Sequence, residues 1–188
     1  MALRLMCAEP AEQGATSLGP GKTQRYGVFL DFGSLFQHPN PGSGVMRTPE
    51  EDELFAAGLG AMGNFYSDAS TLVLRLTTLP KKYPEGYELP EGSNVAEYPE
   101  RGWCYTESRW ASLTKGHSNT LDLGCMSGAE SSRAELVAAC TKGGGRAAPL
   151  LPEEFASILE QKNFTNGKAD RPLVHQDHDL HGFSATFT

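Results

Sequence analysis

Residues 98–113 constrain the fold of this chain most strongly, because they predict a helix with one largely aromatic face. Pro99 suits the first turn of a helix, where the missing backbone N–H has no intrahelical partner to lose. One face of this helix then carries five residues at helical spacing: Trp103, Glu107, Trp110, Ala111 and Thr114. The two tryptophans predict that this face is buried.

Glu107 lies in the middle of that face, where a carboxylate is costly unless it has a partner or a function. An interruption of this kind often marks a functional site. Two interpretations stay open. Glu107 is a site residue, or it reaches solvent or forms an ion pair with an arginine, for which the candidates are Arg75, Arg101 and Arg109.

The composition is that of a globular protein in which a large fraction of the residues lie in irregular loops. Its 188 residues are 39% hydrophobic, which is enough for one domain, and the 21 glycines and 12 prolines predict long loops. The net charge of −7, without a basic stripe, argues against nucleic acid and against an anionic membrane surface as partners. No apolar run is long enough to predict a membrane span.

The cysteines and histidines do not predict a metal site. Cys7, Cys104, Cys125 and Cys140 form no C-x-x-C pair, which argues against a zinc site and against a disulfide scaffold. The imidazoles at positions 175, 178 and 181 could bind a metal, but they lie in an aperiodic segment that is better explained as a solvated tail. We therefore expect a reducing intracellular compartment, the cytoplasm first, with an organelle as the open alternative.

The N-terminal half predicts a parallel crossover. After a polar leader at 1–24, residues 26–32 form a short apolar run that predicts a buried strand ending near Asp31. Residues 48–69 predict a helix, because Thr48 and Glu51 have the spacing of a capping box. Residues 71–77 predict a second buried strand, in which Arg75 is the exception. This strand–helix–strand order implies a right-handed parallel connection.

The rest of the chain predicts one more strand and two more helices. A polar insertion at 79–98 precedes the tryptophan helix, residues 118–124 predict a third strand, and residues 131–141 and 152–162 predict helices. The predicted fold class is α/β, with a small parallel sheet flanked by helices, long loops and an irregular C-terminal extension. The predicted organisation is a leader at 1–24, a core at 25–125, a helical extension at 126–163 and a tail at 164–188.

Asp31, Gln37 and Glu107 are the predicted polar residues of one crevice. The loop after the first strand and the start of the tryptophan helix would both open at the carboxyl ends of parallel strands, where α/β proteins bind ligands. Trp103 would form a stacking wall of this crevice, and Arg101, in the same segment, is a further candidate for ligand contact.

Five features follow one another in this chain: a strand ending in Asp31, then Gln37, a helix with Met62-x-x-x-Tyr66-x-x-Ala69, an apolar strand, and Arg101-x-Trp103-x-x-x-Glu107. In this order they resemble the heterokaryon-incompatibility (HET) domain of fungi. They also resemble the related Toll/interleukin-receptor (TIR) domain, in which a Trp-Cys-x-x-Glu segment begins a comparable helix. The similarity covers residues 26–113 and is closest to HET/TIR-like proteins of algae and other protists, including the segment at 164–168.

This resemblance implies a flavodoxin-like parallel sheet, here without its first strand, because the polar leader stands where these domains usually begin with another strand and helix. It also implies a role in self-association, signalling or defence. In TIR enzymes the glutamate of this segment serves NAD⁺ cleavage, and Glu107 occupies the matching position. A buried carboxylate there could stabilise the positive charge that develops on the ribose.

Two functions of different classes are predicted. The first is a non-catalytic protein–protein interaction module, self-associating or an accessory subunit of a larger assembly. Its loops at 33–47 and 79–98 and its tail would wrap the partner, because long unpaired segments order best against another surface. The alternative is an NAD⁺-cleaving hydrolase with Glu107 as the catalytic carboxylate, NAD⁺ as substrate and no bound cofactor. A third possibility is a globular protein in which Glu107 only pairs with an arginine.

Overall fold

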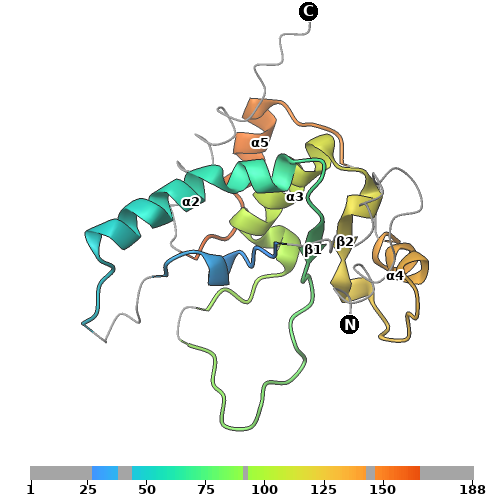
Figure 1. Ribbon diagram of the computed structural model, residues 1–188, viewed down its shortest axis with the longest axis horizontal. Helices are drawn as coiled ribbons and strands as arrows, with labels where there is room; N and C mark the ends of the chain where they lie inside the picture. Colours follow the sequence, from blue (N-terminus) through green and yellow to red (C-terminus); the bar gives the residue numbers. More distant parts are fainter. Residues whose placement is uncertain (1–26, 38–43, 91–92, 143–146, 166–188) are drawn as a thin grey trace, which may run out of the picture. The chain divides into compact units, whose positions relative to one another are not determined.

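The computed structural model describes residues 27–37, 44–90, 93–142 and 147–165 (Figure 1). These residues belong to two units. The boundary between the units falls between Met62 and Gly63, inside the long helix α2 (Pro49–Ser67). The predicted leader at 1–24, the histidines at 175–181 and the tail beyond residue 165 lie outside the described residues.

Helix α2 begins where the capping box predicts it. The backbone N–H of Thr48 donates to Oε2 of Glu51 at 2.8 Å, and the backbone N–H of Glu51 donates to Oγ1 of Thr48 at 3.2 Å. These two contacts satisfy backbone donors that the first helical turn leaves without an intrahelical partner. Nearby, Arg47 pairs with Asp52 at 2.7 Å and lies 4.0 Å from the ring centroid of Phe55. The predicted helix is confirmed, with its end at Ser67 rather than at residue 69.

The predicted strand at 26–32 is wrong. Residues 27–30 have no regular structure, and residues Phe32–Ser34 form a short 3-10 helix, η1. The backbone N–H of Ser34 donates to the carbonyl of Leu30 at 2.7 Å, and the N–H of Leu30 donates to Oγ of Ser34 at 2.9 Å. Local bonds therefore replace the ladder bonds that a strand would need, and Val28 is 67% exposed. The predicted crossover between this run and residues 71–77 is consequently absent from the described part of the chain.

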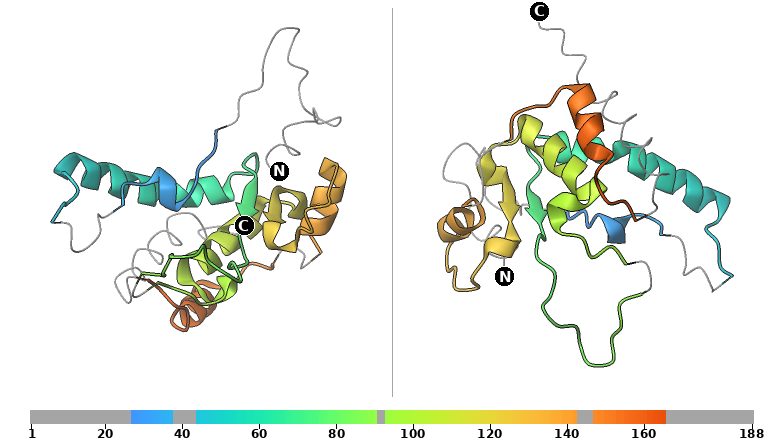
Figure 2. Two further views of the ribbon diagram at one scale, coloured as in Figure 1. Left: turned by 90° about the horizontal axis from the view of Figure 1, so that it is seen from below. Right: turned by 180° about the vertical axis from the view of Figure 1, so that it is seen from behind.

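The C-terminal unit contains a parallel pair of strands, β1 (Val73–Arg75) and β2 (Thr120–Asp122). Their register pairs Val73 with Thr120, Leu74 with Leu121 and Arg75 with Asp122. The predicted strands at 71–77 and 118–124 are confirmed at their centres. The 3-10 helix η2 (Tyr98–Glu100) and helix α3 (Gly102–Thr114) lie between them in the chain. The C-terminal unit is therefore a small α/β unit, with its two strands side by side in the views of Figures 1 and 2.

The helices next to β2 and after it are short. Two 3-10 helices, η3 (His117–Asn119) and η4 (Leu123–Cys125), flank the strand. Helix α4 (Arg133–Cys140) begins at Ser132, whose Oγ accepts from the N–H of Glu135 at 3.2 Å. Helix α5 (Pro152–Leu159) begins with a proline at its first position, which suits a helix start. Both helices were expected from the sequence, with slightly longer bounds.

Two hydrophobic clusters stabilise the C-terminal unit. Leu121 of β2 packs with Leu136 and Cys140 of α4, and Phe155 packs with Leu159 on α5. Helix α3 buries Trp110 and Ala111, as its helical spacing predicts, whereas Thr114 is exposed. The end of α3 also joins the end of α2, because Thr114 Oγ1 and Lys115 Nζ donate to the carbonyls of Ser67 and Asp68. These side chains satisfy carbonyls that have no partner within α2.

The start of α3 contacts the C-terminal end of the described chain. The N–H of Gly102 donates to the carbonyl of Asn163 at 2.8 Å, and the N–H of Asn163 donates to the carbonyl of Glu100 at 2.8 Å. The ring of Phe164 lies against Gly102, where a Cβ would collide with it. Gly102 therefore allows a close approach that a larger residue would block.

Candidate functional site

A cavity of about 620 Å³ lies at the carboxyl ends of β1 and β2. The polar residues that line it come from separate segments of the C-terminal unit: Arg75, Thr77 and Thr78 at and after the end of β1, Glu97 and Tyr98 at the start of η2, Thr120 and Asp122 in β2, and Thr141 after α4. This is the place where parallel sheets commonly bind ligands, because side chains that follow neighbouring strands meet there. Its volume is in the ordinary range for small-molecule sites.

Asp122 is held at the rim of this cavity by two hydrogen bonds. Its Oδ1 accepts from the hydroxyl of Thr77 at 2.5 Å and from the backbone N–H of Gly124 at 2.9 Å. A Cβ at position 124 would collide with the Thr77 hydroxyl, so a glycine is required for this approach. The carboxylate is thereby fixed at the edge of the sheet rather than free to rotate.

Arg75 is the cation that lines the cavity. It is half-buried at the end of β1, in register with Asp122 on the neighbouring strand. Its Nε is buried and has no hydrogen-bond partner, and none of the ion pairs in the described ranges includes Arg75. A buried donor without an acceptor is costly, so this guanidinium is a group to which an acceptor could add binding energy.

Tyr98 lies between the cavity and the buried face of α3. Burial raises the pKa of its hydroxyl well above the usual range, and the nearby groups of Cys104 and Glu107 raise it further. A hydrogen bond with Ser108 and the charge of Arg75 act in the opposite direction. Tyr98 is therefore neutral at physiological pH and lines the cavity as a hydrogen-bonding group.

Glu107 is buried, with 6% of its surface exposed, so the interpretation in which it reaches solvent is wrong. It lies close enough to Tyr98 to affect the pKa of that hydroxyl, but it is not among the residues that line the cavity. Two of its candidate arginine partners donate elsewhere: Arg101 Nε to the carbonyl of Ala96 at 2.7 Å, and Arg109 Nη1 to the carbonyl of Ala148 at 3.3 Å. Glu107 therefore belongs to the layer behind the cavity wall.

The other predicted site residues of α3 take part in packing. Trp103 is half-buried and packs against the cluster of Phe155 and Leu159, outside the lining of the cavity. Arg101 is occupied by its bond to Ala96 and by its backbone bridge to Asn163. The stacking and ligand-contact roles of these two residues stay predictions.

Asp31 and Gln37 belong to the N-terminal unit. Asp31 is exposed and directly precedes η1, and Gln37 Nε2 donates to the carbonyl of Leu35 at 3.2 Å. Because Glu107 belongs to the C-terminal unit, the predicted convergence of these three side chains on one crevice stays a prediction.

Sequence reasoning missed Thr77, Tyr98 and Asp122 as parts of a site. Two signals could have found the cavity: a charged residue, Arg75, in an otherwise apolar strand, and an aspartate at the end of the strand that pairs with it. Cys140 also lines the cavity, but burial raises the pKa of its thiol, which keeps it protonated. The chemistry that this arrangement supplies is binding through one cation, several hydroxyls and two carboxylates, of which Asp122 is fixed by hydrogen bonds.

Across the described ranges, the acidic, histidine and cysteine side chains form no cluster that could hold a metal ion. Within the same ranges, no helix has the length and apolar content that a membrane crossing requires. Comparison of the chain with protein-family models, with curated proteins and with solved structures gives no match.

Proposed function

We propose that this chain is a non-catalytic protein-interaction module that binds a partner protein through its insertion loop, residues 79–97. The observation that supports this proposal is the exposure of large hydrophobic side chains along the loop: Leu79, Tyr87, Leu89 and Val95, of which Val95 is 57% and Tyr87 51% exposed. Exposed apolar side chains gathered on one segment are typical of a binding surface.

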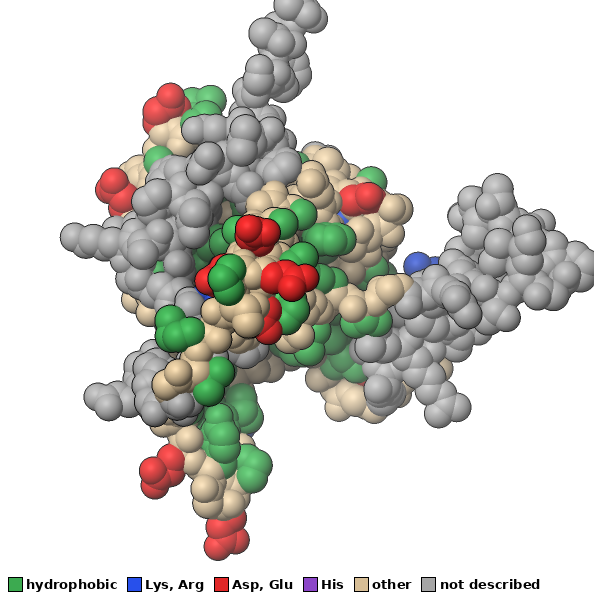
Figure 3. All heavy atoms as spheres, turned by 60° about the vertical axis from the view of Figure 1, so that its left-hand side comes forward, with side chains coloured by type: hydrophobic (Ala, Val, Ile, Leu, Met, Phe, Trp, Pro, Cys, Tyr) green, Lys and Arg blue, Asp and Glu red, His purple; other side chains and the backbone are tan. Residues whose placement is uncertain are grey.

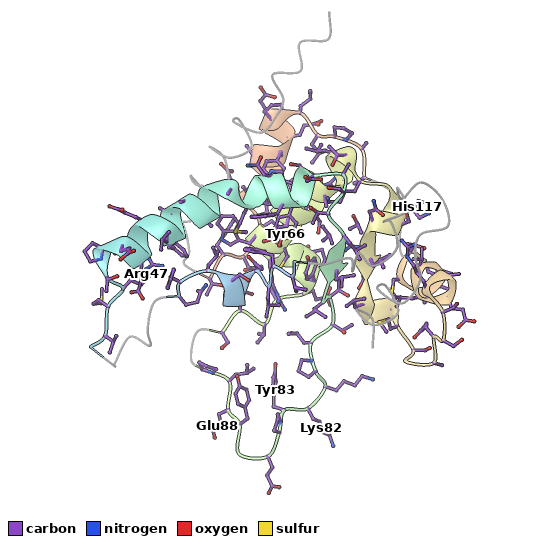
Figure 4. All side chains as sticks on the ribbon, in the orientation of Figure 1. Arg47, Tyr66, Lys82, Tyr83, Glu88 and His117 are labelled. Atoms are coloured by element: carbon purple, nitrogen blue, oxygen red, sulfur yellow. The ribbon has the colours of Figure 1, made fainter. Side chains whose placement is uncertain are left out.

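The loop projects from the C-terminal unit beyond the end of β1 (Figure 1). Figure 3 shows hydrophobic side chains along this projection at the bottom of the view, with acidic side chains at its end. The labelled side chains Lys82, Tyr83 and Glu88 in Figure 4 all lie on it, and the rings of Tyr83 and Tyr87 are 5.4 Å apart. A paired-aromatic projection of this kind can insert into a groove on another protein.

The backbone of the loop makes mostly local hydrogen bonds. The N–H of Tyr87 donates to the carbonyl of Pro84 at 3.0 Å, and the N–H of Ser93 donates to that of Pro90 at 3.1 Å. Prolines fix part of the backbone before binding, which lowers the entropy that a partner must remove. A partner protein would therefore meet a segment that is partly ordered but still exposes its apolar groups.

Site-specific photocrosslinking of the full-length chain tests this proposal. A photoreactive residue at Tyr87 should give one defined adduct in cell extract, whereas the same residue at the exposed position Ser157 on α5 should not. The substitution Leu89→Asp should abolish the adduct without changing the melting temperature. An adduct of twice the chain mass would identify the partner as a second copy.

Two results would contradict the interaction module. Equal adducts from Tyr87 and Ser157 would mean that the loop has no preferred partner. Slow hydrogen exchange of the loop amides in the isolated chain, comparable with β1, would mean that the segment is already buried by its own chain.

A second candidate function is NAD⁺ cleavage with Glu107 as the catalytic carboxylate. The observation that favours it is the position of Glu107 beside Tyr98, because Tyr98 lines a cavity large enough for part of a dinucleotide. Nicotinamide release by the wild type and its loss in Glu107→Gln would support this function. The control is Glu153→Gln, at an exposed carboxylate of α5 that does not line the cavity. Absence of nicotinamide from all three proteins would exclude it.

A further inference from the structure

We infer that the cavity at the carboxyl ends of β1 and β2 binds a small organic anion, with Arg75 as the residue that holds its charged group. The two ends of the insertion loop, Leu79 and Glu97, line this cavity, but the inference does not depend on the loop as a protein-binding surface. It needs neither a catalytic role for Glu107 nor a partner protein.

The first step of the argument is the state of Arg75. Its side chain is half-buried, its Nε is buried without an acceptor, and the ion pairs of the described residues lie elsewhere, at Arg47–Asp52 and Lys162–Glu100. A guanidinium presents a planar set of donors that matches two oxygens of a carboxylate or phosphate. An anion in the cavity would supply the acceptors that the protein does not.

The second step is the position of Asp122. Arg75 and Asp122 are register partners on adjacent parallel strands, so their side chains leave the same face of the sheet as neighbours. Asp122 is nevertheless oriented by Thr77 and Gly124. Two oppositely charged groups that stand side by side and are held separately can bind a ligand carrying both an anion and a nearby hydrogen-bond donor.

The third step is the set of hydroxyls around Arg75 and Asp122, in a cavity that the exposed carboxylate of Glu97 also lines. Thr78 and Thr120 line the cavity, and in the described part of the chain neither hydroxyl donates a side-chain hydrogen bond. Hydroxyls can donate to anionic oxygens or accept from a ligand hydroxyl. The ligand class that fits is a small metabolite with a carboxylate or phosphate group next to a hydroxyl.

A binding experiment with the full-length chain tests whether the anion that binds is a carboxylate or a phosphate. The probes are ribose 5-phosphate and malate, with ribose as the neutral control, and binding is followed by tryptophan fluorescence and by the shift in melting temperature. One of the two anions should bind and raise the melting temperature while ribose does not. The anion that binds identifies the ligand as a phosphate or a carboxylate.

Substitution of Arg75 tests the anchor itself. Arg75→Gln should weaken binding of that anion at least tenfold, and Arg75→Lys should weaken it less, because the charge remains but the paired donors are lost. Arg133→Gln is the matched control, since Arg133 also has a buried Nε without a partner but does not line the cavity. This variant should bind like the wild type.

Folding does not confound this test. Because Arg75 forms no ion pair within the described ranges, Arg75→Gln should keep the melting temperature of the free chain. If Arg75→Gln lowers the melting temperature, Arg75→Lys replaces it as the variant whose anion binding is compared with the wild type. Two results would overturn the inference: neither anion binds the wild type better than ribose does, or Arg75→Gln binds as tightly as the wild type.

Discussion

The hydroxyl of Thr77 donates a 2.5 Å hydrogen bond to Oδ1 of Asp122, and this contact joins the chain after β1 to the end of β2. The two residues are 45 positions apart in the sequence. Only three residues of each strand pair directly, so contacts beyond the ladder contribute much of the order at this edge of the sheet. The same contact fixes the carboxylate that lines the cavity.

Thr77→Val should lower the free energy of unfolding by about 1 kcal/mol, because it removes the hydroxyl donor from a partly buried carboxylate. Thr78→Val is the neighbouring control and should change stability by less than about 0.5 kcal/mol, since Thr78 is exposed. Urea denaturation followed by tryptophan fluorescence measures both. Equal losses would mean that the Thr77–Asp122 bond is not a stabilising contact.

Glu130 should make stability depend on pH in the acid range. Its carboxylate accepts from the N–H and the hydroxyl of Ser127 and from the N–H of Gly128, and these bonds, the Ser127 backbone first, lower its pKa from 4.5 to about 2. The lowered pKa means that its stabilising contribution is complete above about pH 4.5 and is lost as the pH falls toward about 2.

Glu130→Gln should therefore be less stable than the wild type at pH 7, and the difference should shrink as the pH falls below 4.5. Denaturation curves at pH 7, 4 and 3 measure this difference. Glu88→Gln, at an exposed position of the insertion loop, should follow the wild type at every pH. A difference for Glu130→Gln that stays constant with pH would contradict the proposed titration.

Thr48→Ala should destabilise the start of α2 by about 1 kcal/mol, because the N–H of Glu51 loses its acceptor. Thr48→Asp should restore most of the loss, since aspartate is also a favourable N-cap residue. Hydrogen exchange of the amides at 50–53 measures the local effect directly. Unchanged exchange in Thr48→Ala would show that the helix start is held by other contacts.

Leu136→Ala should cost about 2–5 kcal/mol of unfolding free energy, because Leu136 of α4 is fully buried against Leu121 of β2 and leaves a cavity when truncated. Leu151→Ala removes the same atoms at a position that is 64% exposed and should change stability by less than about 0.5 kcal/mol. Denaturant unfolding measures the free energy of unfolding of the two variants, which lose the same atoms at a buried and at an exposed position. If Leu136→Ala lowers the free energy of unfolding no more than Leu151→Ala does, α4 does not contribute to the hydrophobic core.

The sequence predicted those helices and strands that are determined by residues close together in the chain. The capping box at Thr48 and Glu51 defines the start of α2, and helical spacing predicted the burial of Trp110 and Ala111. The apolar run at 26–32 was misassigned because an apolar run shows only that a strand is possible. A strand also needs a neighbour that pairs with it, and residues 27–30 form no ladder.

The cavity could not be predicted, because its lining residues are brought together by pairing and packing between distant segments. Arg75 and Asp122 are neighbours only through the β1–β2 register, and Tyr98 reaches the same place through η2. Trp103 shows the converse. Its position on the predicted aromatic face was visible, but its packing partners on α5 were not, because they lie about fifty residues further along the chain.

The contact of Phe164 with Gly102 sets a practical limit for recombinant fragments. A stop codon before position 163 would leave the N–H of Gly102 without its acceptor and would uncover the aromatic cluster around Phe155. Cloning boundaries for the α/β unit should therefore retain residues through 165, even though the last helix among the described residues, α5, ends at Leu159.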